Sequence, residues 1–138
     1  MSKVNVSAII CYTTIKNNLP LLENCLISIK NAAKQQVNLK ILVNVETDGQ
    51  TNFGKLNKHI NDVLIAKPKS FYTSRHNKSI DYCIKKHKPD YILLINDDAW
   101  VNKKIFQELN KCIDNSPEVI IPMIFRPDNK NLDSFGVE

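Results

Sequence analysis

The sequence contains few glycines and no long apolar run. Its glycines are Gly49, Gly54 and Gly136, so neither the G-x-G-x-x-G fingerprint of a dinucleotide-binding turn nor the G-x-x-x-x-G-K-[ST] pattern of a P-loop can be written. A membrane-spanning helix needs about 18 or more apolar residues in a row, whereas the longest runs, Val6–Cys11 and Tyr91–Ile95, have the length of strands. No basic-then-apolar leader is seen, and we therefore expect a cytoplasmic protein without a membrane span.

The cysteines and the charge point to no metal cluster and no nucleic acid. Cys11, Cys25, Cys83 and Cys112 form no C-x-x-C pair, so we expect buried, reduced thiols rather than a disulfide framework. The formal net charge is +5, and all but two of the 19 cationic residues are lysines. These lysines are scattered, and no RNA-binding aromatic pattern accompanies them. The mildly positive surface suits an anionic small substrate.

With 138 residues, of which 43% are hydrophobic and 24% charged, residues 1–138 are expected to form one globular domain. Apolar runs alternate with segments of helical spacing, which predicts an α/β fold with a mainly parallel central sheet. The run 91–95 is apolar throughout, as in strands buried on both faces of such a sheet. The predicted strands are 4–12, 39–45, 62–66, 91–95 and 119–125; the predicted helices include one capped by Asn18 and one over 74–86.

Polar residues follow three of the predicted strands. In parallel α/β sheets, ligands bind in the crevice at the carboxyl ends of the strands. The residues that leave the first, second and fourth strands are therefore expected to meet at one edge of the sheet. They are Thr13 and Thr14, then Glu46, Thr47 and Asp48, then Asn96, Asp97 and Asp98.

The acidic turn Asn96-Asp97-Asp98 is the strongest chemical signal in the sequence. Mg²⁺ and Mn²⁺ prefer oxygen ligands and usually take one or two carboxylates together with substrate phosphates. Such a pair at a strand end can hold the metal ion against a diphosphate. The same residue types are equally typical of a turn or a helix cap, so the spacing alone leaves both interpretations open.

Several blocks of the sequence resemble family-2 glycosyltransferases with the GT-A fold. The blocks are 6–10, 21–29 and 90–99, followed by 117–119 and 133–136, which resemble the rhamnosyltransferase-like branch of that family. The resemblance implies a Rossmann-like three-layer sandwich that binds a nucleotide diphosphate sugar and transfers the sugar to an acceptor hydroxyl. It also implies Mn²⁺ or Mg²⁺ as cofactor, with Asp98 as the metal-binding acid of a D-x-D motif and Asp97 beside it.

The resemblance also assigns the donor-binding residues. It implies Thr13 and Thr14 near the nucleoside, the segment 43–48 with Glu46 and Asp48 at the base, and Arg75 and Asn77 in a block near the phosphates. Asn96 and Asp97 complete the donor set. One departure is that the family's first aspartate after the second strand is here Val43. Recognition of the base is then expected to have moved to Glu46 or Asp48, or to have weakened.

A second departure concerns length, because the family's acceptor-binding half and its general base normally follow the last matching block. The chain is therefore expected to be a truncated GT-A domain, the donor half, with its catalytic base beyond residue 138 and little sugar transfer on its own. Two alternatives stay open. One is a non-catalytic module that binds a nucleotide or a protein partner; the other is an unrelated α/β domain with a structural acidic turn.

Overall fold

The computed structural model describes residues 2–15, 18–47, 52–120, 124–125 and 132–134. The chain divides into two units, residues 1–107 and residues 108–138. The elements are β1 (Val4–Thr13), α1 (Leu19–Ala33), β2 (Val37–Glu46), η1 (Gly54–His59), β3 (Asp62–Ala66), α2 (Tyr72–His87), β4 (Tyr91–Asn96), α3 (Ile105–Cys112), η2 (Ile113–Asn115), β5 (Ile124–Phe125) and β6 (Leu132–Ser134).

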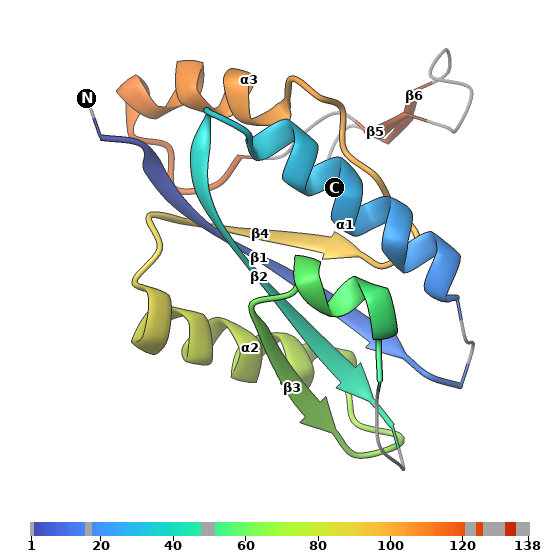
Figure 1. The fold of residues 1–138 in the computed structure, drawn as a ribbon. Helices are drawn as coiled ribbons and strands as arrows, with labels where there is room; N and C mark the ends of the chain where they lie inside the picture. The colour runs from blue at the N-terminus through green and yellow to red at the C-terminus, as the bar shows by residue number, and fades with distance from the viewer. Residues whose placement is uncertain (1, 16–17, 48–51, 121–123, 126–131, 135–138) are drawn as a thin grey trace. The chain divides into compact units, whose positions relative to one another are not determined.

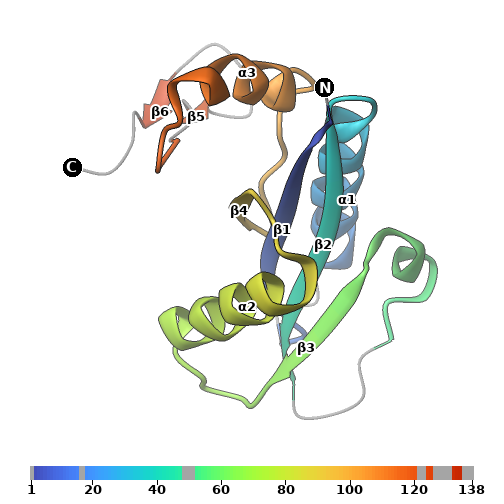
Figure 2. The same ribbon diagram turned by 90° about the vertical axis from the view of Figure 1, so that its left-hand side faces the viewer.

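The first unit is an α/β sandwich around a four-stranded sheet in the order β3-β2-β1-β4. All three pairings are parallel. Figure 2 shows α2 on one face of the sheet and α1 with the short helix η1 on the other. The predicted fold class, an α/β sandwich with a parallel central sheet, is confirmed.

The core lies along β1 and β2, the two strands of the described sheet with a partner on each side. The residues of β1 from Val6 to Tyr12 are buried, as are the residues of β2 from Ile41 to Val45. On α1, the buried positions Leu22, Cys25, Leu26 and Ile29 recur at helical spacing, as the sequence predicted. Asn18 does stand at the N-cap of α1, but its side chain makes no capping hydrogen bond.

Two sequence-based predictions about strands are wrong. The segment 91–95 does form β4, but β4 lies at the edge of the described four-stranded sheet and Leu94 is 50% exposed. An apolar run reports a preference for burial and does not determine how many strands flank it. The predicted parallel strand 119–125 is also wrong, because residues 119–120 are not in a strand and β5 pairs antiparallel with β6 in a separate sheet.

A buried carboxylate joins the start of β3 to the last turn of α2. His87 Nε2 lies 2.6 Å from Asp62 Oδ2, and the Tyr82 hydroxyl donates to Asp62 Oδ1 at 2.9 Å. Lys86 Nζ also donates to Oδ1. Burial by itself would raise the pKa of Asp62, but the hydrogen bonds from Lys86, His87 and Tyr82 outweigh burial and lower that pKa.

We expect Asp62→Asn to lower the free energy of unfolding by about 2 kcal/mol at neutral pH, because a buried, charge-assisted cluster loses its anion. A lowered folded-state pKa means that the stabilisation is present above the ordinary pKa of 3.8 and is lost as the pH falls through the folded-state value. Urea unfolding across acidic pH measures this. The gap between wild type and Asp62→Asn should close on acidification.

The matched control is Asp81→Asn, which removes the exposed pair between Asp81 and Lys85 on the same helix. Exposed pairs contribute little, so the control should change stability by no more than about 0.5 kcal/mol. Equal effects of the two variants at neutral pH would contradict the stabilising role of Asp62.

Candidate functional site at the carboxyl edge of the sheet

The carboxyl ends of β1, β2 and β4 lie at one edge of the sheet (Figure 1). Thr13 pairs in register with Glu46, and Asn96 pairs with Cys11 two residues before the end of β1. The Thr14 amide donates to the Glu46 carbonyl at 3.2 Å. The structure therefore brings Thr13, Thr14, Glu46 and the acidic turn to the same edge.

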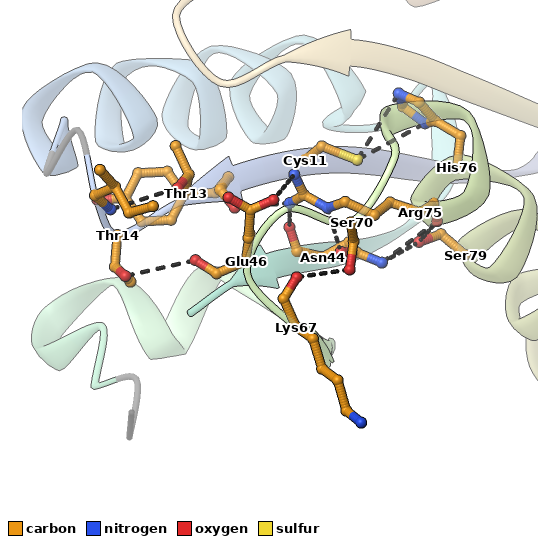
Figure 3. Close-up of polar contacts among 12 residues, drawn as sticks. Cys11, Thr13, Thr14, Asn44, Glu46, Lys67, Ser70, Arg75, His76 and Ser79 are labelled. Carbon is orange, nitrogen blue, oxygen red and sulfur yellow. Dashed lines mark hydrogen bonds and ion pairs between the residues drawn. The ribbon is translucent and has the colours of Figure 1, made fainter. Parts of the chain in front are cut away.

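Arg75 fastens the first turns of α2 to this edge (Figure 3). Its Nη2 donates to the backbone carbonyls of Tyr12 and Asn44, both at 2.7 Å, and its Nε donates to Asn44 Oδ1 at 2.9 Å. The residue is only 7% exposed. Arg75 thus donates to backbone carbonyls near the ends of β1 and β2, and these hydrogen bonds position α2 against the edge of the sheet.

The third guanidinium nitrogen of Arg75, Nη1, lies near the carboxylate of Glu46. Nη1 lies 3.9 Å from Glu46 Oε2, and the Glu46 side chain is 14% exposed. Since the other guanidinium nitrogens are taken, the contacts favour Arg75 as a support for Glu46. Its predicted role as a direct phosphate ligand stays a prediction.

Asn44 is a member of this network that sequence reasoning missed. It is 3% exposed, and its Nδ2 donates to Ser79 Oγ at 3.0 Å and to the Arg75 carbonyl at 3.3 Å. The available signal was a single polar residue in the apolar run 41–45 of β2. A buried amide in a strand needs hydrogen-bond partners, and here α2 supplies them.

The acidic turn is anchored from both faces of the sheet. The Ala99 amide donates to the Asn96 carbonyl at 3.2 Å, and the Cys25 thiol of α1 donates to the same carbonyl at 3.5 Å. From α2, the Tyr72 hydroxyl donates to Asn96 Oδ1 at 3.0 Å. Sequence reasoning missed Tyr72 as well, because nothing in its neighbourhood connects it to a residue 24 positions later.

The two aspartates of the turn differ in their surroundings. Asp97 is half-buried, whereas Asp98 is exposed and has no ion pair or hydrogen bond with another described residue. Burial raises the pKa of Cys25 to about 12, and the charges of Asp97 and Asp98 add to that rise. Burial also raises the pKa of Tyr12, with Asp97 adding again. The turn therefore places negative charge beside the end of β1 and the middle of α1.

The donor atoms at this turn fit a hard divalent cation. Two carboxylates and one amide oxygen are the oxygen ligands that Mg²⁺ and Mn²⁺ prefer. Within the described ranges, no group of three or more His, Cys, Asp or Glu residues is arranged to hold a metal ion by itself. Asp98 and Asp97 would hold the cation, and such ions commonly complete their coordination with phosphate oxygens and water.

Of the remaining predicted donor-binding residues, one lies on another side of α2 from Arg75 and one lies outside the described residues. Asn77 is exposed on α2, while Arg75, His76 and Ser79 of the same helix are buried. Residues two apart on a helix point to different sides, so Asn77 and Arg75 do not share a face. Asp48 lies outside the described residues, and its predicted role at the base stays a prediction.

Val43 is fully buried in β2. The position at which the resembling family has an aspartate therefore faces the core of this chain. On β2, the described acid at the edge is Glu46, the last residue of the strand.

Comparison with known proteins supports the fold. The sequence matches no protein-family model and no curated protein. Two structures of S. aureus TarS, a GT-A-type glycosyltransferase, are similar, each with a TM-score of 0.54 over 80% of this chain; their sequence identities are 14% and 13%. The chain spans 32% of one TarS chain and 20% of the other. At such identities the likeness establishes the α/β fold alone.

No helix in the described segments combines the length and the apolar character that crossing a membrane requires.

Proposed function

We propose that this chain is a glycosyltransferase domain, or the donor-binding part of one, that holds a nucleotide diphosphate sugar at the carboxyl edge of its sheet. The observation that carries the proposal is the convergence of Glu46 and the turn Asn96–Asp98 at one edge of a parallel sheet. The GT-A-type fold of TarS supports it. The reaction moves a sugar from the nucleotide diphosphate to an acceptor hydroxyl.

The acidic turn supplies the metal-binding groups. Asp98, with Asp97 beside it, holds Mn²⁺ or Mg²⁺, and Asn96 is kept in place by Tyr72. When bound, the cation neutralises the charge that develops on a departing diphosphate. The hydrogen bonds of Asn96 matter because a turn whose start is held in place loses less entropy when the cation and the diphosphate bind.

Glu46 is the proposed acceptor for a hydrogen bond from the nucleotide base. Arg75 Nη1 lies 3.9 Å from Glu46 Oε2 and keeps the Glu46 carboxylate at the edge. Arg75 is itself held by hydrogen bonds to backbone carbonyls near the ends of β1 and β2. Thr13 and Thr14 border Glu46 on the neighbouring strand and are proposed to lie near the nucleoside. Base recognition through Glu46 is compatible with a buried Val43, since the two residues have different surroundings.

The test is thermal unfolding in the presence of UDP, GDP or dTDP, each with and without Mn²⁺. A ligand that binds only the folded state raises the unfolding temperature by mass action. We expect at least one nucleotide to stabilise the protein, and to do so only with Mn²⁺. No stabilisation by any nucleotide under either condition would contradict the proposal and favour an unrelated α/β domain.

Val43 also favours a second candidate, a module that binds a nucleotide and carries out no transfer. Both candidates predict Mn²⁺-dependent stabilisation, so turnover separates them. Incubation with a matching nucleotide sugar, Mn²⁺ and an acceptor panel, followed by mass spectrometry, should reveal a glycoside for a transferase. Tight nucleotide binding with neither glycoside nor free sugar would identify the module.

A further inference from the structure

A separate pocket lies at the opposite end of the sheet from the acidic turn. It has a volume of about 260 Å³ and is lined by the end of α1, the first part of β2 and the end of η1. Both helices cover the same face of the sheet (Figure 2). The pocket shares no lining residue with the carboxyl edge, so the proposed donor site leaves it unexplained.

The pocket is lined by basic side chains from two elements. Lys30 and Lys34 come from the last turn and the C-cap of α1, and Lys58 and His59 come from η1. No acidic residue is among the described residues that line it. None of the three lysines is ion-paired within the described part of the chain.

Helix polarity explains part of this arrangement and leaves the rest unexplained. Lysines in the last turn of a helix interact favourably with its negative end, which accounts for Lys30 and Lys34. Lys58 and His59 lie in the last turn of η1, where the same polarity favours them, but this polarity does not explain why the ends of the two helices line one cavity. Like charges that converge without a counterion repel one another, so the cluster is best satisfied by a bound anion.

His59 adds a second observation that points to a ligand. Its Nδ1 is buried and has no hydrogen-bond partner among the described residues. Burial lowers the pKa of His59, the charges of Lys30 and Lys58 lower it further, and Glu23 of α1 partly opposes them. A buried polar atom without a partner costs free energy, and an anion in the pocket would favour the protonated ring of His59, which lines it.

We propose that this pocket binds a phosphate group, either as inorganic phosphate or as part of a small phosphate ester. The ammonium groups of Lys30, Lys34 and Lys58 bind the phosphate oxygens, and the protonated imidazole of His59 adds positive charge beside them. Phosphate is favoured because its several oxygens can accept hydrogen bonds from more than one lysine at once. The volume accommodates a phosphate with a small organic group.

The test is an NMR titration of the full chain with inorganic phosphate, without any divalent metal, that follows the His59 ring and the amides of Lys34 and Lys58. We expect saturable shifts at these positions and a rise in the pKa of His59, because a nearby anion favours the charged imidazole. A parallel titration with glycerol 3-phosphate separates the two sources, since tighter binding identifies an ester. Shifts that do not saturate, or an unchanged pKa of His59 for both probes, would overturn the proposal.

Variants make the test specific. Lys58→Gln should weaken phosphate binding about tenfold, the loss expected for one charge-assisted hydrogen bond. The matched control, Lys78→Gln, removes the same charge from the exposed side of α2 on the other face of the sheet and should leave binding within about twofold. Equal weakening by both would show unspecific attraction and overturn the site. Asp98→Ala should retain phosphate binding, which keeps this test independent of the donor site.

Discussion

Asp98→Ala should abolish the Mn²⁺-dependent part of nucleotide binding, the largest functional effect that we expect of any single substitution. The Asp98 carboxylate is exposed and is not engaged by another described residue, so it is free to enter the coordination sphere of a cation. Without this carboxylate the turn would hold the cation poorly, and the diphosphate would lose the positive charge that the cation supplies. Isothermal calorimetry with a nucleotide diphosphate, with and without Mn²⁺, measures the effect.

Asp97→Ala is the matched comparison, because it removes the same group one residue away. The Asp97 carboxylate is half-buried, and its charge contributes to the raised pKa values of the buried residues Cys25 and Tyr12. We therefore expect Asp97→Ala to weaken Mn²⁺-dependent binding less than Asp98→Ala does. Equal or reversed effects would contradict the assignment of Asp98 as the principal metal ligand.

Arg75→Ala should lower the free energy of unfolding by about 3–5 kcal/mol, the largest effect on stability. The substitution leaves the buried Asn44 side chain and the carbonyls of Tyr12 and Asn44 without their donor. Arg75→Lys should recover only part of this loss, since an ammonium cannot reproduce the planar arrangement of Nε and Nη2. Urea unfolding of both variants measures the difference.

Lys78→Ala is the control for Arg75→Ala, because it removes an exposed cation from the same helix. Surface substitutions of this kind usually change stability by less than about 0.5 kcal/mol. An Arg75→Ala protein as stable as the Lys78→Ala protein would show that the hydrogen bonds of Arg75 contribute little to the fold. A fully stable Arg75→Lys protein would show that the positive charge alone suffices.

The order of elements in the first unit was readable from periodicity. The apolar spacing of α1 placed its buried face, and the predicted strand 39–45 and helix 74–86 became β2 and α2 with shifts of two residues or fewer at each end. Polar residues after apolar runs also predicted which residues meet at the carboxyl edge, because the strands of the described sheet are parallel. These features depend on neighbours along the chain, where sequence patterns are informative.

Features that depend on distant partners were not predictable. The burial of Arg75 follows from carbonyls on β1 and β2, 63 and 31 residues away in the sequence. The contact between Tyr72 and Asn96 and the position of β4 at the edge of the described sheet are likewise set by tertiary pairing. The sequence identified the polar residues at the edge. The structure identified the residues that position them, Arg75 beside Glu46 and Tyr72 beside Asn96.

Paramagnetic broadening by Mn²⁺ tests the central claim most directly, because it locates the bound ion on the chain. In the presence of a nucleotide diphosphate, we expect Mn²⁺ to broaden the amide signals of the turn 96–99 and of Glu46, and to leave those of Asp62 and His87 sharp. Asp62 and His87 lie at the start of β3 and the end of α2, away from the carboxyl edge. Broadening centred on any other part of the chain, or no broadening with any of the nucleotides, would contradict a metal-assisted donor site at this edge.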